Sequence, residues 1–194
     1  MSKLGSHRII KVSAAAAKLK FIECGPSCIS KKDCTSKCCD MVSHPQGMKV
    51  TVHSSEERRI KKLGVNVIDG MLQPTQGKKV CPFKGGDHLC ILHDTGEKPF
   101  GCVVSPFMLN RSDTLVIRNR YKLLPCYDTE SGDYAYRVFY SSLQMIFGAV
   151  IASDIKCKFD LQTVNEDLHY TIPIKTYQMM SDREKLIRAS KTNR

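Results

Sequence analysis

Hydrophobic and polar residues alternate most clearly in the second half of the chain, over residues 114–124. The apolar positions are Leu115, Ile117, Tyr121 and Leu123, and the basic positions are Arg118, Arg120 and Lys122. A period of two places these sets on opposite sides of an extended backbone. The pattern therefore predicts a half-buried strand with one basic face.

Three further segments of this half have a recognisable pattern. Residues 134–139 follow a Ser-Gly-Asp turn and predict a second strand. Residues 140–152 form an apolar run that predicts a buried helix, which Gly148 weakens. Residues 168–172 are a further strand candidate.

Two helices are indicated by the same capping signal. In each, a serine is followed three residues later by a glutamate, just ahead of a charged segment. These pairs are Ser54 with Glu57 before residues 58–63, which Gly64 ends, and Ser181 with Glu184 before residues 183–190. We expect short, charged surface helices in both places.

The first half of the chain is less periodic. Residues 6–20 carry an imperfect apolar stripe among basic residues, which predicts a basic helix or arm. Residues 24–53 and 74–106 are rich in Cys, Pro and Gly and show little periodicity. Because apolar burial cannot order such stretches, we expect a bound ion to organise them.

These patterns predict an α+β fold, in which a small, metal-stapled, loop-rich N-terminal half packs against a short antiparallel sheet with flanking helices. The expected divisions are a basic arm or helix over residues 1–20, a cysteine-cluster region over 21–107 and an α+β region over 108–194, together one compact unit. The 194 residues are 42% hydrophobic, which is enough for a core. No apolar run approaches the roughly 18 residues of a membrane span, so no membrane partner is expected.

Cysteines give the strongest chemical signal. Nine of the ten fall between positions 24 and 126. Close pairs, Cys24 with Cys28 and Cys34 with Cys38, bring two thiolates to one ion at little loop-closure cost. This grouping predicts a metal site to which the distant cysteines supply further ligands.

The cellular compartment decides between metal ligands and disulfides. The N-terminus lacks the apolar segment of a secretory signal, so we expect a cytoplasmic protein with reduced thiols. Two alternatives stay open. Residues 1–22 contain basic residues and no acid, as organelle transit peptides do, and the cysteines also fit a disulfide framework.

The motifs around the cysteines form a recognisable series. In order they are Phe21-Ile22-Glu23-Cys24, Cys38-Cys39, Cys81-Pro82-Phe83, Cys90-Ile91-Leu92-His93, Lys98-Pro99 and Pro106-Phe107. Over residues 21–107 this order resembles the CxxCxxCC cysteine-cluster family of zinc- or iron-chelating domains and, more distantly, flagellin lysine methylases. An insertion around Cys34, Lys98 in place of the usual Arg, and Val103 in place of a basic residue depart from the family pattern.

The resemblance implies which cysteines bind the metal. The implied ligands are Cys24, Cys28, Cys38, Cys39, Cys81, Cys90 and Cys102. Cys34, Cys126 and His93 compete for any remaining coordination positions, and Cys157 is expected to be a lone thiol.

Thiolate chemistry limits which metal ions are expected but does not identify one of them. Soft thiolates favour zinc, iron or copper(I) over magnesium and calcium. The available thiolates suit either two tetrahedral zinc sites or one iron-sulfur cluster with a zinc or free cysteines beside it. Adjacent residues in extended backbone point to opposite sides, so Cys38 and Cys39 are expected to serve different centres unless that stretch is helical. Closed sites with four cysteine ligands stabilise a fold and leave no coordination position open for catalysis. They therefore favour an interaction or accessory module as the function.

Residues 93–100 are nearly the linker that joins tandem DNA-reading zinc fingers. The remainder of a finger is missing, because no second histidine lies at the required spacing from His93. We interpret the segment as a loop between two ligands.

Two other classes of function stay open. A net charge of +11 and the basic positions Arg118, Arg120 and Lys122 are compatible with nucleic-acid binding, although such residues usually only solvate a surface. A metal-cluster-dependent enzyme that modifies a protein partner, similar to the lysine methylases, is implied by the resemblance alone. The sequence has no dinucleotide fingerprint, phosphate-binding loop or metalloprotease motif.

Overall fold

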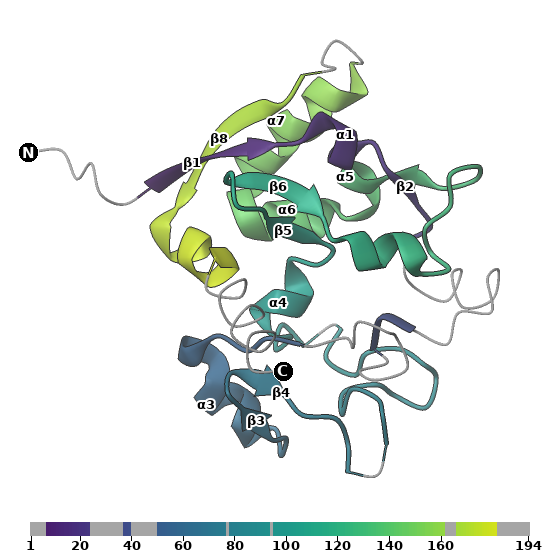
Figure 1. Cartoon of the computed structure of the whole chain (residues 1–194), viewed down its shortest axis with the longest axis vertical. Coiled ribbons are helices and arrows are strands. Elements are labelled where there is room, and N and C mark those ends of the chain that lie inside the picture. Colours follow the sequence, from purple (N-terminus) through teal and green to yellow (C-terminus); the bar gives the residue numbers. More distant parts are fainter. Residues whose placement is uncertain are drawn as a thin grey trace, which may run out of the picture.

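Branched aliphatic residues in four short segments pair into the main sheet of the molecule (Figure 1). The structure is a computed structural model that describes residues 7–23, 37–39, 50–76, 78–93, 95–161 and 166–181. The strands lie in the order β5 (Phe107–Leu109), β6 (Thr114–Ile117), β1 (His7–Val12) and β8 (Leu168–Pro173). The two outer pairs are antiparallel, whereas β1 and β6 run parallel. The expected α+β class is confirmed, with one parallel pair at the centre of a sheet that was expected to be antiparallel.

Residues 7–20, the described part of the segment expected as a basic helix or arm, do not form one continuous helix. Residues 7–12 form β1, whose Ile10 and Val12 side chains are buried. This strand pairs with β6 on one side and β8 on the other. Pairing with these distant strands stabilises the extended conformation more than the weak helical pattern of apolar residues stabilises a helix. A single helical turn, α1 (Ala14–Ala17), and the short strand β2 (Lys20–Phe21) follow.

The strand expected over residues 114–124 ends at Ile117. The chain then turns into a 3-10 helix, η2 (Asn119–Leu123). Because a 3-10 helix repeats every three residues, the predicted alternation fails there. Tyr121 is buried as expected, but Leu123 is 64% exposed.

The segments after this turn are mostly helical. Of the strand expected over residues 134–139, only Tyr134 lies in a strand. This strand, β7 (Asp133–Tyr134), pairs with β2, and the helix α5 (Ala135–Val138) follows directly. The helix expected over 140–152 forms as two, α6 (Tyr140–Phe147) and α7 (Ala149–Asp160). Gly148 separates them with a φ of +83°, which glycine adopts at little cost. The strand expected over 168–172 is confirmed as β8, and the helix expected over 183–190 lies outside the described residues.

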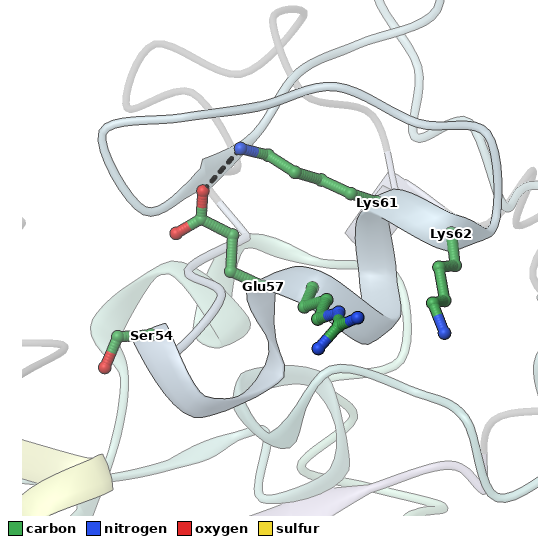
Figure 2. Close-up of a pocket in the computed structure, with 5 residues that line it drawn as sticks. Ser54, Glu57, Lys61 and Lys62 are labelled. Carbon is green, nitrogen blue, oxygen red and sulfur yellow. Dashed lines mark ion pairs between the residues drawn. The ribbon is translucent and has the colours of Figure 1, made fainter.

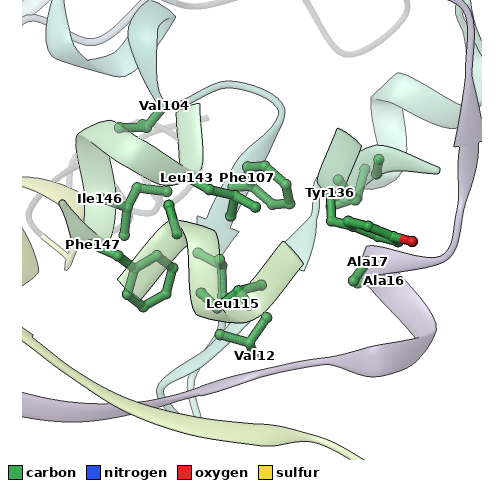
Figure 3. Close-up of a cluster of buried hydrophobic side chains, with 14 of the residues drawn as sticks. Val12, Ala16, Ala17, Val104, Phe107, Leu115, Tyr136, Leu143, Ile146 and Phe147 are labelled. Atoms are coloured by element: carbon green, nitrogen blue, oxygen red, sulfur yellow. The ribbon is translucent and has the colours of Figure 1, made fainter. Parts of the chain in front are cut away.

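The larger hydrophobic core lies between the main sheet and these helices (Figure 3). Val12 and Leu115 from the sheet share it with Leu143, Ile146 and Phe147 of α6. The core therefore joins the first strand of the chain to elements more than a hundred residues later.

A smaller core lies below the sheet in Figure 1, around α3 (Ser54–Lys62) and the hairpin of β3 (Val67–Ile68) and β4 (Met71–Leu72). Its buried members are Val52, Ile60, Val67, Leu72, Cys81, Phe83 and Leu92. The helix α3 has a capping box, as expected, but its capping pair is His53 and Glu56, one residue before the expected pair of Ser54 and Glu57. Gly64 follows the C-cap with a φ of +79°, as its predicted role requires.

Three short helical segments remain. The helix α4 (Phe100–Val103) lies between the main sheet and α3 in Figure 1, η1 (Lys37–Cys39) is a single 3-10 turn, and residues 174–181 are helical directly after β8. Within the described ranges, no helix has the length and apolar character needed to cross a membrane.

Candidate metal centre

Seven of the predicted or competing cysteine positions can be placed in the structure. Cys38 and Cys39 lie on η1, Cys81 and Cys90 on the loop that follows β4, Cys102 on α4, Cys126 after η2, and Cys157 on α7. Cys39, Cys81, Cys90 and Cys157 are free thiols. Cys24, Cys28 and Cys34 lie outside the described residues.

A tight turn brings Cys81 and Cys90 together. Lys84 and Cys90 form an antiparallel bridge, and the Ile91 amide donates to the Phe83 carbonyl at 2.9 Å. Gly85 allows this turn, because a Cβ at that position would lie 2.8 Å from Asp87 Oδ1 and 3.2 Å from the Leu89 carbonyl oxygen. The Cys-Pro-Phe and Cys-Ile-Leu motifs are thus two sides of one hairpin.

The η1 turn lies against this hairpin. The Cys81 amide donates a hydrogen bond of 2.9 Å to the Cys39 carbonyl. Cys39 packs on the smaller core, whereas Cys38 packs on the larger one. The two adjacent cysteines therefore face different cores, although they lie on a 3-10 turn and not on the extended backbone from which different directions were expected.

Cys102 reaches the hairpin because α3 fixes the start of α4. Glu56 Oε1 accepts the Phe100 amide at 2.9 Å and the Arg59 guanidinium at 3.1 Å. Arg59 also donates to the Glu97 carbonyl at 2.5 Å. These bonds attach the loop before α4 to the smaller core.

Two further thiols influence the pKa of Cys81. Burial raises the pKa of Cys81 to about 12, a backbone hydrogen bond with Phe83 opposes the rise, and Cys102 and Cys90 add to it. A buried thiol of this kind becomes a thiolate only when a cation compensates its charge. Cys90 on the hairpin and Cys102 on α4 therefore lie near enough to Cys81 to affect its ionisation.

Cys38 and Cys102 both influence the pKa of Tyr121. Burial raises the pKa of Tyr121 well above its ordinary value; Arg120 opposes the shift, and Cys38 and Cys102 add to it. Both thiols thus lie near the same buried phenol. Even so, the residues that the structure describes contain no group of three or more Cys, His, Asp or Glu side chains arranged to hold a metal ion.

The remaining candidate ligands lie elsewhere. His93 is exposed, and its Nδ1 lies 2.7 Å from Lys98 Nζ. Cys126 packs on the larger core, and its carbonyl accepts the Ile22 amide at 2.8 Å. Cys157 is exposed on α7. None of these three is among the main influences on the pKa of Cys81.

The predicted basic face is divided by the 3-10 helix. Arg118 is only 7% exposed and donates to the Phe107 carbonyl at 3.1 Å. The Arg120 guanidinium carbon lies 5.5 Å from the centre of the Tyr121 ring, and Lys122 is exposed. A phosphate backbone therefore has access to Lys122 but not to the Arg118 side chain.

Two residues that position the site were not identified from the sequence. Glu56 and Arg59 connect α3 to α4, but their charges resemble those of any exposed helix. The three-residue spacing between His53 and Glu56, which is that of a capping box, could have identified Glu56 from the sequence.

An open pocket also lies on α3 (Figure 2). It is lined by Ser54, Glu57, Arg58, Lys61 and Lys62, and Glu57 pairs with Lys61 at 2.6 Å. All its lining residues belong to one helix, so the pocket is a basic helix face and not a site assembled from several segments.

Comparisons with known proteins found no match. No family model, no curated protein and no solved structure matches the chain.

Proposed function

We propose that this chain is a metal-binding protein whose clustered cysteines hold zinc or an iron-sulfur cluster where its two cores meet. The supporting observation is the hairpin that pairs the Cys81 and Cys90 segments and binds the Cys39 carbonyl through the Cys81 amide, with Cys102 near enough to raise the pKa of Cys81. The proposed ligands also include Cys38 and, from outside the described residues, Cys24 and Cys28. Four-cysteine sites close the coordination shell, which favours a structural role.

The size of the smaller core supports this role. Its buried members come from loops and short elements between residues 52 and 92. Burial on this scale is small against the entropy lost by ordering so much irregular chain. A metal that binds only the folded form supplies the missing stabilisation. We propose that the stabilised region serves as an interaction or accessory module for a protein partner in the cytoplasm.

Metal analysis of protein purified without air tests the proposal. Colourless protein with stoichiometric zinc, or brown protein with stoichiometric iron and sulfide, is the expected result. Protein that contains no metal under these conditions would contradict it.

Cysteine substitutions test the ligands one at a time. Cys81→Ser and Cys102→Ser are expected to lose metal and to loosen the smaller core, as are Cys24→Ser and Cys38→Ser. Cys157→Ser is the matched control, because Cys157 is an exposed thiol on α7 and its loss should leave metal content unchanged. Equal metal loss in all five variants would show that the metal is not held at the proposed centre.

A further inference from the structure

We propose that two copies of this chain associate by pairing their β8 strands edge to edge and antiparallel, so that the main sheets of both copies form one continuous sheet. The partner of this surface is therefore a second copy of the chain. The association goes beyond the proposed metal-binding function and uses none of the proposed ligands, so either proposal can fail without the other.

The two edges of the main sheet differ in length. The strand β5 is an edge of three residues, whereas β8 at the opposite edge has six. Every residue of β8 pairs with β1 on one side. Within the described ranges, no strand pairs with its other side. A long edge strand of this kind presents its free main-chain groups to a further strand.

The pairing of β1 determines which main-chain groups of β8 are free. The Lys11 amide donates to the carbonyl of Asp113, the residue before β6. Because main-chain groups alternate in direction along a strand, those of Lys11 and Ile9 point towards β6 and those of the β1 residues between them point towards β8. In the register of β1 with β8, Lys11 and Ile9 lie opposite His169 and Thr171. The amides and carbonyls of His169 and Thr171 therefore point away from β1.

A second β8 strand that runs antiparallel satisfies all of these groups. Their amides and carbonyls form no hydrogen bond within the described part of the chain. In the proposed dimer, the two-fold axis passes through Tyr170, and His169 of each copy lies opposite Thr171 of the other. Each such pair then exchanges both of its N–H···O hydrogen bonds. Pro173 has no N–H group, so the pairing ends there.

The strand β8 lacks the charges that commonly protect an edge strand. Its sequence, Leu-His-Tyr-Thr-Ile-Pro, contains no lysine, arginine, aspartate or glutamate. The side chains of His169 and Thr171 are exposed. The Tyr170 side chain lies on the helix-covered face of the sheet, where its ring centre is 5.9 Å from that of Phe147. No like charges therefore come opposite each other along the paired strands.

Charges of opposite sign flank the two ends of β8. Glu166 lies two residues before the strand, and Lys175 lies two residues after it. Both are exposed, and neither forms an ion pair with the described residues. Because the paired strands run antiparallel, Glu166 of each copy comes level with the helical segment that carries Lys175 in the other copy. An extended peptide of any sequence supplies the hydrogen bonds, but the second copy also supplies complementary charges at both ends.

The net charge of +11 opposes self-association at long range. At physiological ionic strength, exposed charges more than about 8 Å apart are largely screened. The charges of Glu166 and Lys175 would lie close together in the dimer and are screened less. Contacts along β8 therefore outweigh the general repulsion between two basic chains.

Sedimentation equilibrium of the full chain under reducing conditions tests the proposal. The reducing agent excludes dimers that are joined through the exposed Cys157 thiol. We expect a reversible monomer–dimer equilibrium of the wild type in the micromolar range. Thr171→Pro removes an amide that points away from β1, so the variant should fold but stay monomeric. Thr171→Val keeps this amide and is the matched control, which should dimerise like the wild type.

Charge reversal tests the antiparallel register. Glu166→Lys and Lys175→Glu should each raise the dimer dissociation constant about three- to tenfold, because the two-fold axis places the pair twice in the interface. The double variant should associate like the wild type. Lys122→Glu is the control for net charge, because it reverses an exposed cation on η2 and should not weaken the dimer.

Hydrogen exchange locates the interface directly. The His169 amide should gain protection as the concentration of the wild type rises, and it should gain none in Thr171→Pro. A wild-type chain that stays monomeric would overturn the inference, even if an extended peptide of another protein binds β8. Equal dimerisation of folded Thr171→Pro and Thr171→Val would also overturn it. If Thr171→Pro does not fold, a double charge reversal that fails to restore association would have the same consequence.

Discussion

Asp160 shows how a single side chain at the end of α7 ties several elements together. Its Oδ1 accepts Tyr136 Oη and Arg137 Nε, both at 2.8 Å, and its Oδ2 pairs with Lys156 at 2.7 Å. These hydrogen bonds, with Lys156 first and Tyr136 and Arg137 after it, lower the pKa of Asp160 to about 2. Burial and the bond to Asp160 raise the pKa of Tyr136 to about 12. The ionised carboxylate therefore holds α5 against α7.

The pH dependence of stability follows from this low pKa. The folded-state pKa lies below the ordinary value of about 3.9, so the contribution is complete above about pH 4 and is lost as the pH falls towards 2. We expect Asp160→Asn to lower the free energy of unfolding by about 1 kcal/mol at pH 7, after allowance for solvent screening. Denaturant titrations from pH 7 to pH 2 should show this difference shrink in the acid range.

Glu130→Gln is the control for that titration. Glu130 is exposed and forms no ion pair with the described residues, so its substitution should change stability little at any pH. A difference between Asp160→Asn and wild type that stays constant down to pH 2 would contradict the assigned role of the charge.

At the scale of elements, α3 is defined by local signals and α4 by its neighbours. The helix α3 has a capping box, acidic residues in its first turn and basic residues in its last, all of which stabilise a helix locally. The single turn of α4 has no side-chain cap of its own, and Glu56 supplies the acceptor for its first amide. One carboxylate therefore serves two helix starts.

Removing this carboxylate is expected to weaken both helices. Glu56→Ala should lower the free energy of unfolding by about 1–2 kcal/mol, because it removes a cap and leaves the Phe100 amide without its acceptor. Glu57→Ala is the matched control on the next residue. It removes only an exposed pair with Lys61, worth about 0.3–0.5 kcal/mol. Thermal unfolding of the two variants measures the difference, and equal effects would show that Glu56 does not serve both helices.

At the scale of the whole molecule, the two cores differ in how they are assembled. The larger core joins β1 to helices near the other end of the described chain, and aromatic side chains such as Phe21 and Tyr136 fill it. The buried members of the smaller core all come from residues 52–92 and include Cys81. Stability should therefore be unequal between them, with the metal more important to the smaller core.

Metal removal tests this inequality by hydrogen exchange. After treatment with a chelator, the amides of Val52 and Leu72, which bond within the smaller core, should lose protection first. The Ile10 amide in β1 should keep most of its protection, because β1 is held by its pairing with β8 and lies in the larger core, away from the proposed metal ligands of the smaller core. Equal loss of protection in both regions would contradict this inequality, because it would show that both cores unfold as one cooperative unit when the metal is removed.

Local signals determined a definite part of this protein from the sequence. The class of fold, the end of α3 before Gly64, the position of β8 and the break at Gly148 follow from capping chemistry, alternation and glycine, although α3 begins at Ser54 and not at residue 58 as expected. The metal site expected from the close spacing of the cysteines stays a prediction.

Tertiary structure alone decided the rest. Residues 7–12 became a strand because β6 and β8 supply partners that no local window contains. The same long-range packing buried Arg118, divided the predicted basic face and brought Cys102 to Cys81 through the contacts of Glu56. Spacing along the chain determines which residues can come into contact at a small cost in loop-closure entropy. Burial and hydrogen bonds between distant segments determine which residues are in contact in the folded protein.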